Sequence, residues 1–132
     1  MINKLIWIDQ NVNEKENKLF IVKIQKKFKI KVVSFNNVDF GLKYIIDKCK
    51  FELILVIVSG RFFPSYCEAL KKSINDMTSI PISIIFTLKK DLYKDYCNCK
   101  EKIGDAFYNP GGVVDSFIEI ETIIERYLKK NH

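Results

Sequence analysis

The chain has 132 residues, of which 48% are hydrophobic and 29% charged, and this balance predicts one folded domain spanning residues 1–132 and excludes a disordered chain. Its longest apolar runs are strand-length, far short of the ~20 residues that a bilayer requires, so no membrane segment is expected. The net charge of +6 comes mainly from lysine, with only Arg61 and Arg126 as arginines, which disfavours nucleic acid as a partner because arginine is the usual reader of bases.

The N-terminal residues predict a strand and then a helix. A short apolar run ends at Asp9, which marks the end of the first strand. Asn13 and Glu16 form a capping pair that is typical of a helix start, and apolar residues then recur at mostly helical spacing as far as Lys29.

Residues 1–4 lack the layout of a signal peptide, so we expect an intracellular, cytoplasmic protein.

The middle of the chain contains its most apolar segment. Residues 30–35 predict a second strand and residues 40–49 a second helix. The run Leu53 to Val58 is apolar at every position, which is typical of a strand that is buried on both faces. It ends in Ser59-Gly60-Arg61, with no carboxylate. The tip of this third strand therefore limits the chemistry available there.

A third helix and a fourth strand follow. Ser65 and Glu68 form a capping box, which predicts a helix that begins at about Ser65. Ile80 to Phe86 predicts the fourth strand, which Thr87 closes, and residues 88–102 predict a weaker, less regular helix.

The C-terminal segment predicts a short strand and a long helix. Residues 106–108 indicate a fifth strand, which is followed by Asn109 and a turn rich in proline and glycine. Ser116 and Glu119 form another capping box, and a well-marked amphipathic helix continues from there to Leu128.

Five strands that alternate with five helices predict an α/β fold. Right-handed crossovers give a parallel sheet with helices on both faces, and the simplest layout is doubly wound and flavodoxin-like, with strand order 2-1-3-4-5. The carboxyl ends of the central strands then meet at one edge of the sheet, where such folds bind their ligands. The residues expected there, in a crevice for a ligand or a switch, are Asp9, Gln10, Ser59, Gly60, Arg61, Thr87 and Asn109.

This pattern resembles a response-regulator receiver domain over the whole chain. The shared features are the five βα units, Asp9 after the first strand, the hydroxyl of Thr87 after the fourth, and Asn109-Pro110 where the family has a Lys-Pro pair. The resemblance implies phosphoryl transfer to an Asp at the tip of the third strand, with Mg²⁺ held by that Asp and an acidic pair after the first strand.

The positions that carry this chemistry in the family are altered here. Ser59 or Gly60 takes the acceptor's place, Gln10 replaces part of the acidic pair, and Asn109 stands where the lysine would be. We therefore expect a pseudo-receiver without metal or cofactor, a non-phosphorylatable signalling module that binds another protein or another domain of a larger parent chain. The family's common contact face corresponds here to Tyr93, Tyr96, Phe107 and Tyr108, which core packing would explain equally well.

A second, shorter resemblance is to Toll/interleukin receptor (TIR) domains. Residues 56–70 contain a strand followed by Ser65, Tyr66-Cys67 and Glu68, similar to the segment in which enzymatic members carry a Glu that helps to cleave NAD. The resemblance implies either a scaffold or an NAD-cleaving enzyme that uses Glu68. However, Glu68 follows Cys67 directly, whereas the family spaces them, and Trp7-Ile8-Asp9 replaces the family's first-strand motif. Enzymatic activity is left open, with a non-enzymatic role favoured.

Three of the crevice residues have alternative roles. Asp9 is either a ligand or a group that accepts amide hydrogen bonds in the loop before the first helix. Thr87 is either a switch residue or a strand-end hydroxyl bonded to the backbone. Arg61 is the best candidate to hold an anionic small ligand, together with backbone amides, but Asp9 or Glu68 would also suit it as an ion-pair partner. Association as a homodimer is also open.

The four cysteines, at positions 49, 67, 97 and 99, do not indicate a metal site or a disulfide framework. Structural zinc usually requires two close pairs of ligands, and only the last two cysteines form such a pair, while His132 is the sole histidine. Reduced thiols, as in an intracellular protein, are expected.

Overall fold

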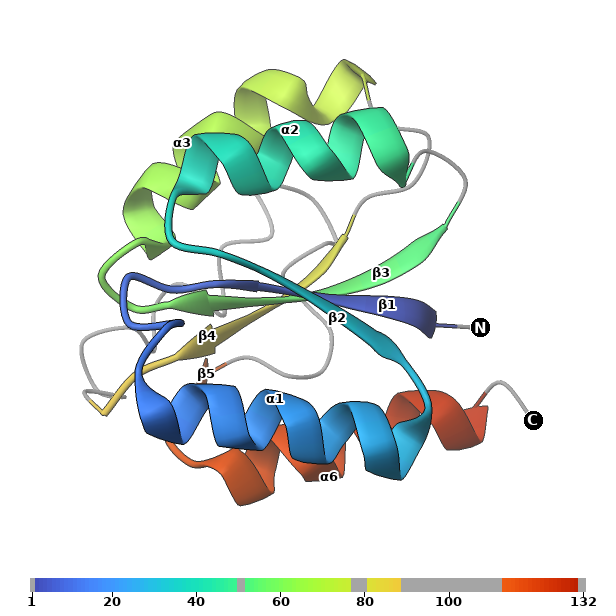
Figure 1. The fold of residues 1–132 in the computed structure, drawn as a ribbon. Coiled ribbons are helices and arrows are strands. Elements are labelled where there is room, and N and C mark those ends of the chain that lie inside the picture. Colours follow the sequence, from blue (N-terminus) through green and yellow to red (C-terminus); the bar gives the residue numbers. More distant parts are fainter. Residues whose placement is uncertain (1, 50–51, 77–80, 89–112, 131–132) are drawn as a thin grey trace.

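The computed structural model, which describes residues 2–49, 52–76, 81–88 and 113–130, contains one parallel sheet between two layers of helices (Figure 1). The strands are β1 (Ile2–Ile8), β2 (Lys31–Phe35), β3 (Leu53–Ser59), β4 (Ile82–Phe86) and β5 (Val113–Val114), in the order β2-β1-β3-β4-β5. The described helices are α1 (Lys15–Phe28), α2 (Val38–Lys48), α3 (Phe63–Ser73) and α6 (Phe117–Lys130), with a 3-10 turn, η1 (Ile74–Asp76), after α3. The predicted doubly wound α/β fold and its strand order are confirmed.

The central strand β3 is buried on both faces, as its apolar sequence predicted. It pairs in parallel with β1 on one side and with β4 on the other. Leu55 and Ile57 face the core beneath α1 and α6, whereas Val56 and Val58 face the core beneath α2 and α3, and all four are fully buried. A sheet that is apolar on both faces requires a helical layer on each, which is why the helices divide between the two sides.

Helices α1 and α3 do not begin after their predicted capping residues. The N-cap of α1 is Glu14, whose side chain makes no cap hydrogen bond, so the proposed start at Asn13 is wrong. Helix α3 begins at Phe63, which puts Ser65 inside the first turn rather than at the cap. The reason is local: the turn that leaves β3 leads directly into the helix, with the Phe63 amide bonded to the Gly60 carbonyl at 3.2 Å.

Helix α2 begins at Val38, slightly before the predicted range of 40–49, and α6 begins directly after its predicted capping residue, Ser116. The Asn37 side chain accepts a hydrogen bond from the Phe40 amide at 3.1 Å at the start of α2. At the start of α6, the Ser116 hydroxyl accepts from the Glu119 amide at 3.3 Å, which confirms the predicted cap.

The fifth strand lies later in the chain than predicted. The structure has Val113–Val114 at this position of the sheet, in register with Ile85 and Phe86 of β4, whereas residues 106–108 had been assigned to it and lie outside the described residues. Two β-branched residues are too short a run to be recognised as a strand by pattern. As a consequence, Asn109 precedes β5, and the residue that follows the carboxyl end of this strand is Asp115. The predicted helix over 88–102 also lies outside the described residues, apart from Leu88.

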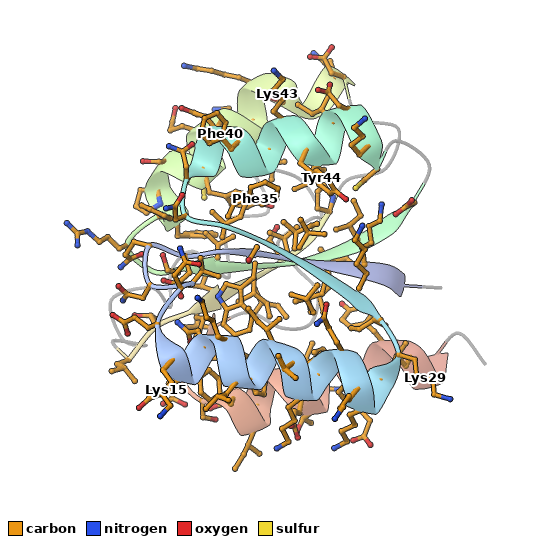
Figure 2. The ribbon with its side chains drawn as sticks, in the orientation of Figure 1. Lys15, Lys29, Phe35, Phe40, Lys43 and Tyr44 are labelled. Atoms are coloured by element: carbon orange, nitrogen blue, oxygen red, sulfur yellow. The ribbon has the colours of Figure 1, made fainter. Side chains whose placement is uncertain are left out.

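The outer strand β2 and helix α2 show how the surface is divided. Phe35 and Tyr44 lie between α2 and the sheet, with ring centroids 5.5 Å apart, whereas Phe40 and Lys43 project outward (Figure 2). Phe40 is 66% exposed and so does not belong to the core. On the far edge of β2, the Val32 amide donates to the Gln25 side chain at 3.1 Å.

No described helix has the length and apolar character needed to cross a membrane.

One buried hydrogen bond joins α3 to the sheet. The hydroxyls of Tyr66 and Ser83 are 2.7 Å apart, and both residues are almost completely buried. Burial raises the pKa of Tyr66 above its usual range, so the phenol stays protonated into strongly alkaline solution. Each hydroxyl satisfies the other inside an otherwise apolar layer.

We expect Tyr66→Phe to lower the free energy of unfolding by about 1–3 kcal/mol, because the Ser83 hydroxyl would be left buried without its partner. Ser83→Ala should have a comparable effect, and the double variant should cost less than the sum of the two. Urea denaturation of the four proteins measures this coupling, with Ser65→Ala, at an exposed position of the same helix, as control. Additive effects would show that the hydroxyls do not interact.

A second connection, of ionic character, joins α1 to α6. The Glu121 carboxylate lies 3.0 Å from the Lys23 ammonium and 3.4 Å from that of Lys27. The hydrogen bond from Lys23, and the charges of both lysines, lower the pKa of Glu121 below its ordinary value. The lysine side chains are 63% and 47% exposed, so solvent screening limits what the pairs contribute.

Because the pKa of Glu121 is lowered in the folded state, its contribution is present above the unfolded pKa of about 4.3 and is lost as the pH falls through the folded value. Glu121→Gln should therefore lower the free energy of unfolding by about 0.2–1 kcal/mol at neutral pH, and this difference should disappear in strongly acidic solution. Urea titrations at the two pH values measure it. Glu125→Gln, at an exposed position of the same helix, is the matched control. A difference that persists at low pH would assign the effect to packing instead of charge.

Candidate functional site

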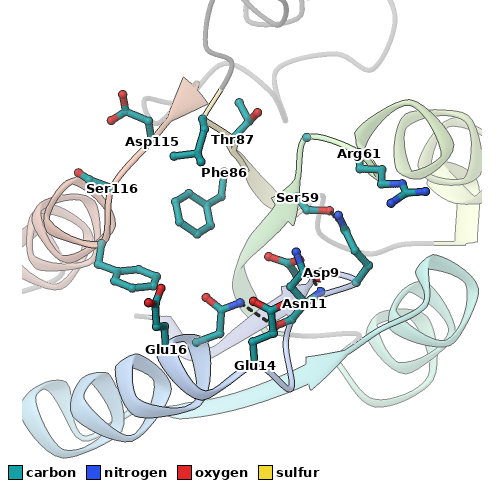
Figure 3. Close-up of a pocket in the computed structure, with 15 residues that line it drawn as sticks. Asp9, Asn11, Glu14, Glu16, Ser59, Arg61, Phe86, Thr87, Asp115 and Ser116 are labelled. Atoms are coloured by element: carbon teal, nitrogen blue, oxygen red, sulfur yellow. Dashed lines mark hydrogen bonds between the residues drawn. The ribbon is translucent and has the colours of Figure 1, made fainter.

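A pocket of about 740 Å³ opens at the carboxyl ends of β1, β3, β4 and β5 (Figure 3). The described residues that line it are Asp9, Gln10, Asn11, Glu14, Glu16, Asn17, Ser59, Gly60, Arg61, Phe86, Thr87, Leu88, Asp115, Ser116 and Phe117. All of the predicted crevice residues that the structure describes are among them. We refer to this cavity as the strand-tip pocket.

Ser59, the last residue of β3, joins the third strand to the loop after β1. Its hydroxyl donates to the Gln10 side-chain oxygen at 2.7 Å and accepts from the Phe62 amide at 3.3 Å. Ser59 is only 5% exposed. A hydrogen bond between two uncharged side chains therefore connects the strand tip to this loop.

Asp9 has a structural role in the loop before α1. One carboxylate oxygen accepts from the Asn11 amide at 2.8 Å, and the other accepts from the Trp7 indole nitrogen at 3.4 Å. Its side chain is nearly buried. Of the two roles that the sequence left open, the contacts match the acceptance of hydrogen bonds in the loop, because both oxygens have protein donors.

Arg61 lies at the rim of the strand-tip pocket. It is exposed, and its side chain points away from the middle of the pocket (Figure 3). Among the described residues, no ion pair involves Arg61, so the pairing with Asp9 or Glu68 that the sequence left open is not present. The amides near it are already engaged: Gly60 donates to the Phe86 carbonyl at 3.0 Å and Phe62 to the Ser59 carbonyl at 3.0 Å. This arrangement does not resemble an anion-binding site.

The remaining predicted residues are dispersed. Thr87 lines the pocket, and its amide donates to the Val114 carbonyl at 2.9 Å, which ties the end of β4 to β5. Glu68 is exposed on α3 and is not part of the pocket lining. The last crevice residue and the predicted contact face lie outside the described residues; these are Asn109, Tyr93, Tyr96, Phe107 and Tyr108.

Sequence reasoning missed an aromatic cluster beneath the pocket. Phe86 and Phe117 line the cavity with ring centroids 5.6 Å apart. Phe117 stacks on Phe20 at 4.2 Å, and Trp7 packs edge-on against Phe86 at 5.9 Å. Trp7 and Phe20 are buried, so they support the two half-buried rings from below. The only sequence signal was an aromatic residue at the end of a strand and another at the start of the last helix.

Three carboxylates of the lining were also missed. Glu14 and Glu16 lie at the start of α1, and Asp115 lies between β5 and α6. In sequence they resemble ordinary acidic residues near helix starts, where the helix dipole favours them. The structure brings them to one pocket together with Asp9. Among the described residues, four carboxylates and one guanidinium line the pocket in a chain of net charge +6, so the charge of this described lining is opposite to that of the protein.

The described residues contain no group of three or more His, Cys, Asp or Glu side chains placed to hold a metal ion. The pocket carboxylates are therefore not gathered into a coordination sphere in this structure. The cysteines that the structure describes, Cys49 and Cys67, are at the end of α2 and within α3, as predicted.

No protein-family model matches this chain, and comparison with curated proteins found no match. The resemblances to receiver and TIR domains thus rest on the residue pattern alone. The contacts in the strand-tip pocket provide the independent observations on which a function can be based.

Proposed function

We propose that this domain is a receiver-like signalling module that carries out no phosphoryl transfer and works by binding another protein or another domain of its parent chain. The observation that supports this most directly is the hydrogen bond of 2.7 Å between Ser59 and Gln10. In the family pattern these two positions belong to carboxylates that share a Mg²⁺ ion. Here two uncharged side chains satisfy each other.

The physical difference between the two arrangements is large. Two carboxylates about 4 Å apart repel each other by about 4 kcal/mol at an effective dielectric constant of about 20, and a divalent cation relieves this repulsion. The Ser59–Gln10 pair has no such repulsion to relieve. Asp9, the one acidic residue retained at these positions, has both oxygens engaged by Asn11 and Trp7. The Ser59–Gln10 pair therefore needs no cation to offset repulsion, and the end of β3 offers no carboxylate nucleophile.

We do not extend this proposal to NAD cleavage. A carboxylate that assists glycosidic bond cleavage must reach the bound substrate. Glu68 is exposed on α3 and does not line the strand-tip pocket. The geometry of the described residues thus gives the non-enzymatic role the better support.

Two measurements test the proposal. Incubation of the protein with acetyl phosphate and Mg²⁺ should leave its intact mass unchanged. By contrast, the double variant Gln10→Asp/Ser59→Asp should gain Mg²⁺ affinity, because it places two further carboxylates beside Asp9. Mg²⁺ at 100 times its dissociation constant should then stabilise this variant by about 2.7 kcal/mol, measured by urea denaturation with and without the ion.

The neutral variant Gln10→Asn/Ser59→Asn is the matched control, because it breaks the same hydrogen bond without adding charge. It should show no response to Mg²⁺. A phosphoryl adduct on the unmodified protein that is lost in Asp9→Asn would overturn the proposal.

A further inference from the structure

The strand-tip pocket has an open part that the Ser59–Gln10 pair does not occupy. Its floor is formed by the rings of Phe86 and Phe117, and Phe86 lies in the middle of the cavity (Figure 3). Because Trp7 and Phe20 hold these rings from below, the floor is preorganised. The Phe86 and Phe117 rings are tilted 44° to each other, so they form an angled apolar surface against which an aromatic ligand can pack, and their π-faces attract positive charge.

The side of the pocket next to this floor carries negative charge. Glu14 and Glu16 rise from the start of α1 toward the cavity (Figure 3), and both are exposed. Within the described part of the chain, no hydrogen bond or ion pair involves either carboxylate. Asp115 adds a third carboxylate at the start of α6. The pocket therefore combines an aromatic floor with an acidic wall.

The groups that would bind an anion are turned away or already used. Arg61 points out of the pocket, and the amides of Gly60 and Phe62 donate to backbone carbonyls of the protein. The Ser59 hydroxyl donates to Gln10. These contacts disfavour the anionic small ligand that the sequence left open, because the Ser59 hydroxyl and the amides of Gly60 and Phe62 are already bonded within the protein and Arg61 points outward.

From this combination we propose that the strand-tip pocket binds small organic cations with an aromatic body, which packs against the rings of Phe86 and Phe117 while its amidinium, guanidinium or ammonium group meets Glu14 and Glu16. Such a ligand obtains an apolar contact, a cation–π contact and charge-assisted hydrogen bonds from one cavity. This binding does not depend on the proposed signalling role, because it uses none of the residues that replace the phosphoryl site.

Three probes of one shape and different charge test the proposal. Benzamidine is cationic, benzamide is neutral and benzoate is anionic. We expect benzamidine to bind with a dissociation constant of roughly 1 mM, as is usual for a fragment of this size, and benzamide to bind at least about 10-fold more weakly. Benzoate should not bind measurably. Titration of the ¹⁵N-labelled full chain, followed by NMR, gives the affinities, and the amide shifts should centre on Glu16, Thr87 and Ser116.

Variants identify the residues that provide the charge. Glu14→Gln/Glu16→Gln should weaken benzamidine binding by about 10-fold and bring it close to that of benzamide. Both residues are exposed, so the fold should be retained. Glu125→Gln, which removes one carboxylate at an exposed position outside the pocket, should leave the affinity unchanged. The proposal is overturned if benzoate binds as tightly as benzamidine, if benzamidine does not bind, or if the double variant and the control behave alike.

Discussion

The burial of β3 on both faces is the constraint on which the rest of this structure depends. A strand with apolar side chains on each face is stable only if the sheet on its two sides and the helices above and below it exclude water. Pairing with β1 and β4 places neighbouring strands on both sides of β3, and the two helical layers cover its two faces. The same pairing aligns Ser59 with Phe86, which brings the ends of neighbouring strands to one level and forms the pocket between them.

At this level the chain combines two kinds of contact. On one side, uncharged hydrogen bonds close the space between β3 and the loop after β1. On the other, between β4 and the two helices α1 and α6, the space stays open over an aromatic floor. Folds of this kind commonly bind ligands at the carboxyl ends of their strands. Here hydrogen bonds fill one part of that edge of the sheet, and the other part remains an open pocket. The first feature supports the proposed signalling role, and the second supports the binding of cations.

Long apolar runs made most of the fold predictable, because a strand that is buried on both faces has apolar residues at nearly every position. Leu53 to Val58 and the segment before Thr87 are of this kind. The start of α3 and the position of β5 were not predictable, since each depends on hydrogen bonds to distant or neighbouring backbone: the turn from Ser59 in one case and the contact of Val114 with Thr87 in the other. The amino-acid sequence contains no local pattern that indicates such backbone hydrogen bonds.

The site was predictable in its location but not in its charge. Topology alone brings Asp9, Ser59 and Thr87 to one edge, because parallel strands end there together. The orientation of Arg61 and the approach of Glu14 and Glu16 depend on side-chain packing, which residue patterns do not specify. For this reason the sequence suggested an anion site, whereas the described residues form a wall of carboxylates.

The hydrogen bond from the Val32 amide to the Gln25 side chain has a consequence for assembly. The outer edge of a sheet offers unpaired N–H groups to which the strand of another molecule can add, and proteins reduce this risk by covering or charging the edge. Gln25 covers one of these donors on β2, and Lys31 places a charge at the start of the same strand. Extension of the sheet from molecule to molecule is thereby opposed along β2.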